Sequence, residues 1–278
     1  MSKSAPQRPD GPTEGQRIAT LARFQRHRVA WQKNPAIREL YRTWYGLLAE
    51  ALEQAPAGPR IELGSGPGFA REFIADLELT DLVAAPWHDR AMSADDLPFP
   101  DRSVAALVLF DVLHHLPSPT AFFAEASRTL APGGIIAICD PYIGPLSYPI
   151  YKLFHDEPLD LSADVVNQNG DRNKDPFDSN QAISTIMFGR QRAEFERRFP
   201  DLEIVSTEKL AGSSYPASGG FSRPPFLLLP LWRVLAAVER RLPRIVFDLI
   251  GFRMLVVLRK RFDVPAALAD GGAPGVGS

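Results

Sequence analysis

The chain has 278 residues, of which 45% are hydrophobic and 23% charged, and its formal net charge is −2. This composition is typical of a globular protein with a sizeable core, and the near-neutral balance does not indicate a nucleic-acid partner. The single cysteine, Cys139, excludes an internal disulfide, and its apolar neighbours predict a buried structural thiol in a reducing cytoplasm.

The two ends of the chain differ from its middle. Residues 1–15 are polar and rich in proline and glycine, without the apolar core of a signal peptide, and the C-terminus is rich in glycine, alanine and proline. We expect a disordered leader over 1–15, a disordered tail over 263–278, N-terminal helices over 16–56 and one α/β domain over 57–262. No apolar run approaches the ~20 residues of a membrane span.

Two helices are predicted before the α/β domain, over 16–33 and 36–54, with a break at Asn34-Pro35. The second helix has apolar and aromatic residues at the spacing of one buried face. We expect most of them to pack on a sheet. The alternative is that Tyr41, Trp44 or Tyr45 lines a lid over a ligand cleft.

A glycine-rich stretch follows at 61–70. A short apolar run that contains a carboxylate leads directly into three glycines at alternate positions. Such glycines allow a ligand to approach the backbone and take positive φ without steric cost. We expect a helix over 69–76, with its N-terminal N–H groups directed at a bound anion. The candidate binding residues are Glu62, Gly64, Ser65, Gly66 and Gly68.

The spacing of these glycines distinguishes between ligands. Dinucleotide-binding enzymes prefer G-x-G-x-x-G, whereas this loop reads G-x-G-x-G, and an ordinary strand–helix turn is a further alternative. Glu-Leu-Gly-Ser-Gly-Pro-Gly resembles motif I of the class I S-adenosylmethionine-dependent methyltransferases. The resemblance implies that the loop contacts the methionine part of S-adenosyl-L-methionine, and that Glu62 lies near its ammonium group, directly or through water.

A second carboxylate has the position of a ribose ligand. A strand is predicted over 78–82, and Asp81 follows Gly64 by 17 residues. A carboxylate at the tip of the second strand can accept hydrogen bonds from both hydroxyls of a ribose. We therefore assign Asp81 to the ribose, the alternative being a surface acid in a loop.

Residues 90–103 resemble the third-strand region of the type 11 methyltransferases, a group that includes quinone C-methyltransferases. The group usually has an Asp-Ala pair there, with the acid near the adenine amino group. Here the pair is Ser93 and Ala94. A serine hydroxyl can accept from the amine, though less strongly than a carboxylate, so this departure affects the expected affinity for adenine.

The next elements complete the resemblance. Residues 105–111 form an apolar run typical of a strand buried on both faces, and its tip, Phe110 and Asp111, is expected to face the cofactor. Ser118-Pro119 begins a helix that ends before Pro132-Gly133-Gly134, and 135–140 is a fifth strand. The resemblance implies a Rossmann-like, seven-stranded, mostly parallel sheet with helices on both faces and an antiparallel last strand.

Beyond residue 140 the resemblance weakens. We expect the insertion 141–180 to lie over the carboxyl ends of the strands and to form part of an acceptor pocket. A helix is predicted over 181–198, a sixth strand over 202–210 and the last strand over 252–258. The insertion 212–251 is apolar, and the stretch from Phe221 to Phe262 contains nine basic residues and only two acidic ones. It either lies in a bilayer interface, docks another subunit or packs as ordinary helices.

Methyl transfer requires a general base only when the acceptor must lose a proton. His155 and Glu157 are the candidate catalytic residues because they lie in the segment expected over the pocket. For His114 and His115 we favour structural roles. We predict no metal site, since adjacent side chains diverge and no C-x-x-C or H-x-x-x-H pair occurs.

The sequence therefore predicts a cytoplasmic or membrane-peripheral methyltransferase that uses S-adenosyl-L-methionine on a small or lipid-linked acceptor, with transfer to oxygen. Transfer to carbon, of the quinone type, is the first alternative. A non-catalytic protein that binds S-adenosylmethionine is the second, and a nicotinamide oxidoreductase is the third.

Overall fold

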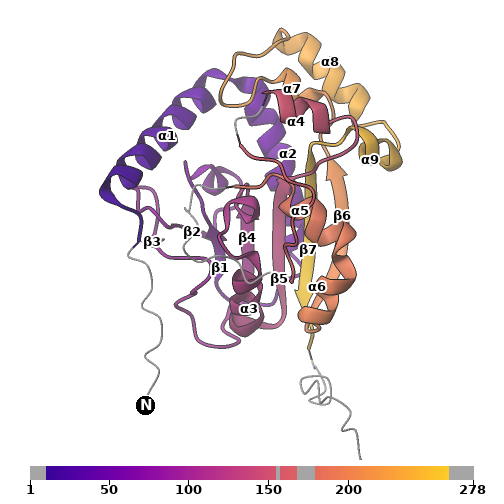
Figure 1. The fold of residues 1–278 in the computed structure, drawn as a ribbon. Coiled ribbons are helices and arrows are strands. Elements are labelled where there is room, and N and C mark those ends of the chain that lie inside the picture. Colours follow the sequence, from indigo (N-terminus) through magenta and orange to yellow (C-terminus); the bar gives the residue numbers. More distant parts are fainter. Residues whose placement is uncertain (1–10, 155–156, 168–178, 263–278) are drawn as a thin grey trace, which may run out of the picture.

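The computed structural model describes residues 11–154, 157–167 and 179–262, which form a seven-stranded sheet flanked by helices (Figure 1). The strand order is β3-β2-β1-β4-β5-β7-β6; β1 to β5 pair in parallel, and β7 is antiparallel to both of its neighbours. The predicted fold class is confirmed. The strands are β1 (Arg60–Leu63), β2 (Leu77–Asp81), β3 (Arg90–Ala91), β4 (Val104–Phe110), β5 (Leu130–Pro141), β6 (Leu202–Leu210) and β7 (Arg253–Lys260).

Helices cover both faces of this sheet. On one face lie α1 (Glu14–Lys33) and α2 (Pro35–Leu52), and on the other lie α3 (Pro119–Thr129), α5 (Ile183–Thr185), η3 (Ile186–Arg190) and α6 (Arg192–Arg198). The central strand β4 is buried at every residue, as expected of a parallel strand packed on both faces. Its side chains divide between two apolar clusters, one for each face.

The carboxyl ends of the parallel strands are at the top of Figure 1, where several short helices gather. They are α4 (Tyr148–Phe154), α7 (Ser214–Ala217), α8 (Leu229–Glu239), η4 (Arg244–Val246) and α9 (Phe247–Ile250). Ligands of open α/β sheets bind at this edge. The insertions 141–180 and 212–251 thus place their described helices at the ligand-binding edge of the sheet.

The break at Asn34-Pro35 also fixes the second insertion. The Asn34 side-chain oxygen accepts hydrogen bonds from the backbone N–H groups of Ala36 and Ile37, at 3.1 and 3.2 Å, and so caps α2. Its amide nitrogen donates to the Ser218 carbonyl at 2.8 Å. One buried asparagine therefore joins the N-terminal helices to the segment after β6.

Two predicted helices differ from the structure. The helix expected over 69–76 is a single 3₁₀ turn, η1 (Phe69–Glu72), because β2 already begins at Leu77 and leaves no length for a longer helix. The helix expected over 181–198 is divided by the π-helical turn η3, which contains Gly189, a poor helix former. The predicted leader up to residue 10, the tail over 263–278 and His155 lie outside the described residues.

Candidate functional site

The turn after β1 needs its glycines. Gly64, Gly66 and Gly68 have φ angles of 66°, 49° and 77°, in the left-handed region that side chains disfavour. A Cβ atom at Gly64 would lie 2.5 Å from Val112, and one at Gly68 would lie 2.5 Å from the Trp87 ring. The backbone of this turn is therefore closely approached on two sides. Because η1 is only one turn long, the turn lacks the helix whose N-terminus was expected to bind an anion.

Asp81 lies directly against this turn. One carboxylate oxygen accepts from the Gly66 N–H at 2.9 Å and the other from the Val83 N–H at 3.0 Å. Burial raises the pKa of the carboxyl group, and the two backbone N–H groups oppose that rise. Because an ionised carboxylate has about four acceptor sites, each oxygen can still accept a further hydrogen bond. The structure thus brings together the glycine turn and the acid that the sequence assigned to a ribose.

Glu62 is the second acid beneath the turn. It is fully buried, and Oε1 accepts a hydrogen bond from the Tyr45 hydroxyl at 3.0 Å. Oε2 is buried and has no hydrogen-bond partner among the described residues. Burial raises the pKa of Glu62 to about 7. An unpaired buried carboxylate oxygen is costly, and a bound cation would satisfy it.

Side chains far from the turn in sequence cover its outer surface. The ring nitrogens Trp87 Nε1 and His88 Nε2 both contact the Gly66 carbonyl, at 2.7 and 2.8 Å. Arg28 of α1 donates to the Pro67 carbonyl at 2.7 Å and stacks over the Trp87 ring. The residues that cover the turn thus come from α1 and the 85–88 segment. The candidate lid residues of α2 are instead buried in the core: Tyr41, Trp44 and Tyr45.

Ser93 and Ala94 follow the short edge strand β3. The Ser93 hydroxyl donates to Asp95, and Ser93 also forms an isolated backbone bridge with Asp96. Ala94 packs against the apolar cluster on the α3 face. The expected acceptor for an adenine amine is therefore already engaged as a donor, although its oxygen can still accept.

Asp111 at the tip of β4 is held by the far end of the chain. It has a φ angle of 58°, and its carboxylate forms a two-point ion pair with the guanidinium of buried Arg253, whose Nη2 lies 2.8 Å from Oδ2. The hydroxyl of Tyr41 lies 3.5 Å from Oδ2. The neighbouring Phe110 stacks on Tyr45, with ring centroids 4.7 Å apart. Phe110 is thus a core side chain that packs against Tyr45, the residue whose hydroxyl donates to Glu62.

A buried polar chain runs between the tips of β4 and β5. His114 Nδ1 lies 2.8 Å from Asp140 Oδ1, and Asp140 Oδ2 accepts from the Ser184 hydroxyl at 2.5 Å. On its other side, His114 Nε2 lies 3.5 Å from a carboxylate oxygen of Glu157. Burial lowers the pKa of His114, but Asp140 and Glu157 outweigh burial and raise it to about 10. His114 is therefore an imidazolium at neutral pH.

His115 completes this cluster. Its Nε2 lies 3.8 Å from Glu157, and its ring centroid lies 4.1 Å from that of His114. Burial, together with the charge on His114, lowers the pKa of His115, so its imidazole is neutral at pH 7. Gln181 donates to Glu157. The His114 cluster, as we call it, thus consists of His114, His115, Asp140 and Glu157 above β4 and β5.

The expectation that adjacent histidines diverge is wrong here. One ligand atom from each of His114, His115 and Glu157 lies within 4.8 Å of the others, which is compatible with binding a metal ion. A second such group joins Asp111, His114 and Asp140, but Arg253 already pairs with Asp111. Asp140 would orient His114 in the first group as carboxylates commonly orient metal-bound histidines.

The central part of the chain is similar to known proteins. Residues 61–138 match the family model described as a methyltransferase domain. Over these residues the chain is similar to methyltransferase domains. The match covers β1 to β5 and includes the glycine turn, Asp81 and the His114–His115 segment, so the resemblance to the S-adenosylmethionine-dependent, type 11 methyltransferases is confirmed for these residues.

Curated relatives match this domain over a limited length. A probable S-adenosylmethionine-dependent methyltransferase from Mycolicibacterium smegmatis is 32% identical over 95 residues, which are 29% of this chain and 37% of the relative. A demethylmenaquinone methyltransferase from Tropheryma whipplei is 34% identical over 61 residues, 21% of this chain and 25% of that protein. The chain thus spans little more than a third of the first relative and a quarter of the second.

Solved structures similar in fold share little sequence. The geranyl diphosphate C-methyltransferase of Streptomyces coelicolor is 16% identical, with a TM-score of 0.42 over 78% of this chain and 76% of that one. The [4+2]-cyclase SpnF is 13% identical, with a TM-score of 0.49 over 92% and 98% of the two chains.

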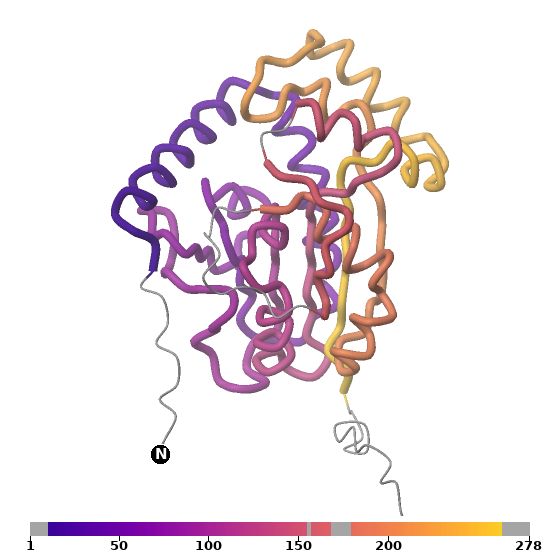
Figure 2. Tube along the Cα trace, viewed as in Figure 1, coloured from indigo at the N-terminus to yellow at the C-terminus, as the bar shows by residue number. Residues whose placement is uncertain are grey.

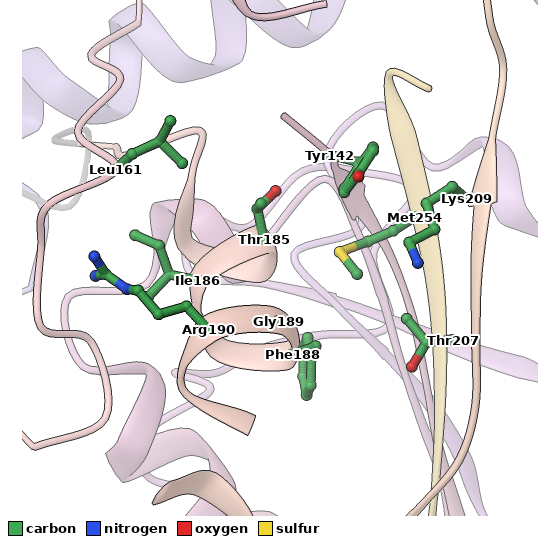
Figure 3. A pocket seen from close by; sticks show the side chains of 10 residues that line it. All are labelled: Tyr142, Leu161, Thr185, Ile186, Phe188, Gly189, Arg190, Thr207, Lys209 and Met254. Carbon is green, nitrogen blue, oxygen red and sulfur yellow. The ribbon is translucent and has the colours of Figure 1, made fainter. Parts of the chain in front are cut away.

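Outside the residues that match the family model, a pocket of about 410 Å³ lies between α5–η3 and the strands β6 and β7. Figure 3 shows Thr185, Phe188 and Gly189 on its helical side and Thr207, Lys209 and Met254 on its strand side. The insertion 141–180 contributes Tyr142 and Leu161 to this pocket. The pocket adjoins the His114 cluster through α5, where Ser184 bonds Asp140 and the next residue, Thr185, lines the cavity.

Sequence reasoning missed several residues that shape this candidate site. Trp87, His88, Arg28 and Arg253 belong to no recognised motif, and their contacts depend on tertiary structure. The His114–Asp140 pair had a signal, because His114 follows β4 and Asp140 lies at the end of the adjacent parallel strand β5: Phe110 of β4 is in register with Cys139 of β5. Cys139 is fully buried, as predicted, and burial raises the pKa of its thiol.

Proposed function

We propose that the protein transfers a methyl group from S-adenosyl-L-methionine to a hydroxyl group of a small or lipid-linked acceptor. One observation carries the proposal: an unpaired buried oxygen of Glu62 lies beneath a positive-φ glycine turn whose backbone also touches Asp81. The domain match to methyltransferases supports the same assignment.

The residues present fit this cofactor. Glu62 Oε2 would accept from the amino group of the methionine part, and the spare acceptor sites of Asp81 would receive the ribose hydroxyls. The turn 64–68 would lie against the methionine part, and Ser93 and Ala94 would lie towards the adenine. When bound, S-adenosylmethionine supplies an electrophilic methyl group on a sulfonium centre.

Glu157 is our candidate base for a hydroxyl acceptor. A carboxylate oxygen of Glu157 lies 3.5 Å from Nε2 of His114, and Gln181 donates to the same carboxylate, so its position is fixed. His114 is already protonated and cannot accept a proton, and the lowered pKa of His115 makes that imidazole a weak acceptor, so Glu157 is the better candidate. Because in-line displacement depends mainly on orientation, this cluster has to position the acceptor as well as deprotonate it. His155 stays a second candidate from the sequence.

Shortened ligands test the two halves of the cofactor site. Titration calorimetry is performed with S-adenosylhomocysteine and with methylthioadenosine, which lacks the amino-acid group. We expect Glu62→Gln to weaken only the first ligand and Asp81→Ala to weaken both, by about 1–3 kcal/mol for a lost buried hydrogen-bonding group. Asp76→Ala, a change at an exposed acid, is the control. Equal loss of both ligands in Glu62→Gln would refute the assignment of Glu62.

Turnover is tested with methyl-labelled cofactor and a cell extract as the source of acceptor. We expect Glu157→Gln to slow labelling while leaving S-adenosylhomocysteine affinity unchanged, and Glu196→Gln, in the exposed Arg192–Glu196 pair, to leave both unchanged. A labelled methyl group attached to a carbon atom of the acceptor, instead of an oxygen, would favour C-methylation. Cofactor binding without a labelled product would favour the non-catalytic alternative, and binding of NAD would favour an oxidoreductase.

The acceptor is proposed to enter beside the insertions 141–180 and 212–251, which gather at the carboxyl ends of the strands (Figure 1). We also propose that the second insertion contacts a membrane surface, which would suit a lipid-linked acceptor. No helix in the described part of the chain is long and apolar enough to cross a membrane, so this contact would be interfacial.

A further inference from the structure

Helix α8 is apolar on two opposite sides. Trp232 and Ala236 are buried against α7 and α2, as expected of a packed face. Leu231, Val234 and Val238 repeat at helical spacing on the other side and are exposed. A surface helix normally presents charged or polar residues there. This side of α8 is therefore built to contact something other than water.

The exposed apolar surface continues on both sides of α8. Phe226 and Leu228 precede the helix, the latter 76% exposed, and Ile245 and Leu249 follow it, the former 74% exposed. Such a run of large exposed side chains exceeds the scattered apolar residues of an ordinary surface.

Helix α4 of the first insertion adds to the same surface. Leu153 is 73% exposed, and Phe154 beside it lies under the Arg223 guanidinium, 5.5 Å from the ring centroid. The Leu146 N–H donates to the Leu249 carbonyl at 2.9 Å, which joins the start of this segment to α9. The tube in Figure 2 shows α4 of the first insertion at the same end of the molecule as the second insertion. We call this surface the apolar cap; its exposed members are Leu146, Ile150, Leu153, Phe154, Phe226, Leu228, Leu231, Val234, Val238, Ile245 and Leu249.

The charges around the apolar cap are mainly positive. Arg223, Arg240 and Arg241 are exposed at its border. The two acids of the second insertion are occupied elsewhere: Glu239 is buried and accepts from the Ser214 N–H at 3.2 Å, and Asp248 pairs with Lys209 at 2.9 Å. The apolar cap therefore presents aliphatic and aromatic groups with unbalanced arginines.

We propose that the apolar cap inserts into the interface of a bilayer that contains anionic phospholipids. Large aliphatic side chains flanked by arginines are the composition of interfacial protein segments, and anionic headgroups complement the charge. A second copy of this chain fits less well, because a two-fold contact through this surface would bring like-charged arginines together, and the nearby acids Asp248 and Glu208 already pair with Lys209 and Arg244.

The position of the apolar cap gives this contact a role. It lies at the carboxyl ends of the strands, the edge that carries Asp111, the His114 cluster and the glycine turn (Figure 1). Docking there turns the site towards the bilayer, so that a lipid-linked acceptor reaches it without crossing water. This role, though not the docking itself, rests on the proposed methyl transfer.

Vesicle flotation of the full chain tests the docking. We expect flotation with phosphatidylcholine vesicles that contain phosphatidylglycerol, and much less with phosphatidylcholine alone. Arg240→Gln with Arg241→Gln should lower binding about 25-fold, since each arginine near an anionic surface contributes about fivefold. The control is Arg197→Gln, at an exposed arginine of α6 outside the apolar cap.

The apolar part is tested with Leu228→Asp, Ile245→Asp and Leu153→Asp, whose side chains are too exposed for the change to unfold the protein. Each should lower flotation at least tenfold, and Leu153→Asp tests whether α4 takes part. The control is Ile18→Asp on α1, an exposed apolar residue outside the apolar cap. Circular dichroism confirms that every variant folds.

Three results would overturn the proposal: no flotation with anionic vesicles, flotation that the aspartate variants leave unchanged, or a dimer in ultracentrifugation that Leu228→Asp dissociates. The last would assign the apolar cap to a second copy. Binding of S-adenosylhomocysteine in the absence of vesicles is measured in parallel by calorimetry. Flotation without cofactor binding would refute the methyltransferase proposal alone, and cofactor binding without flotation would refute the docking alone.

Discussion

Replacing Asp140 by asparagine tests the charge state of the cluster above β4 and β5. The side chain lies between His114 Nδ1, at 2.8 Å, and the Ser184 hydroxyl, at 2.5 Å. Asparagine has the same shape and can accept from one and donate to the other, so the change removes charge and keeps both hydrogen bonds. The proposed mechanism depends on this charge, because it makes His114 a cation and leaves Glu157 as the base.

The contribution of His114 to the free energy of unfolding follows from its pKa, which is about 10 in the folded protein and about 6.5 in an unfolded chain. The folded protein therefore holds this proton more tightly. The resulting stabilisation is fully present below pH 6.5 and is lost as pH rises through 10. The slope cannot exceed about 1.4 kcal/mol per pH unit for one proton, and the total is on the order of a few kcal/mol.

Urea unfolding between pH 7 and 10 measures this dependence. We expect the free energy of unfolding to fall with pH in the wild type and to fall much less in Asp140→Asn, in which burial favours neutral His114. Asp76→Asn, at an exposed acid, should keep the wild-type slope. Imidazole nitrogen shifts in NMR spectra report the His114 proton directly. A neutral His114 at pH 8 in the wild type, or equal slopes in all three proteins, would refute the reasoning.

Three further predictions concern the same edge of the sheet. Binding of S-adenosylhomocysteine near pH 7 should release up to about half a proton, because the ligand's ammonium group favours the ionised form of Glu62, whose pKa is about 7. Calorimetry in two buffers of different ionisation enthalpy measures this release, and its absence would show that Glu62 does not contact the ligand. EDTA should leave turnover unchanged; a loss that a divalent metal restores would make His114, His115 and Glu157 a metal site. Arg253→Met should lower the free energy of unfolding by about 3 kcal/mol, at the low end for a broken buried ion pair because Asp111 is partly exposed, and Asp111→Asn should recover part of it in urea unfolding.

The strands other than the two-residue β3 were predictable because each is an apolar or alternating run of residues. The predicted second strand, over 78–82, corresponds to β2 at Leu77–Asp81, and the sixth strand was predicted over the residues of β6. The antiparallel position of β7 came from the family resemblance and is confirmed. The helix after the glycine turn was overestimated, because local propensity does not show how early the next strand must begin. The π turn at Ile186–Arg190 likewise has no signal in periodicity.

The site was predictable where it depends on strand order. Glu62 and Asp81 end neighbouring parallel strands, so their closeness to one turn follows from topology. The cover formed by Arg28, Trp87 and His88 was not predictable, since no spacing rule relates a helix residue near the N-terminus to a loop after β2. The pairing of Asp111 with Arg253 joins residues 142 positions apart. The sequence showed an excess of arginines near the C-terminus but not which one enters the core.

That long-range ion pair has a consequence for biosynthesis. Residues up to the tip of β5 leave the ribosome well before Arg253, and domains can begin to fold during synthesis. Until β7 is made, Asp111 lacks the cation that neutralises it, and the sheet lacks the strand between β5 and β6. The nascent methyltransferase region can therefore collapse early but acquires its final arrangement late. A ribosome stalled shortly before codon 253 should expose a chain that proteases still cut readily.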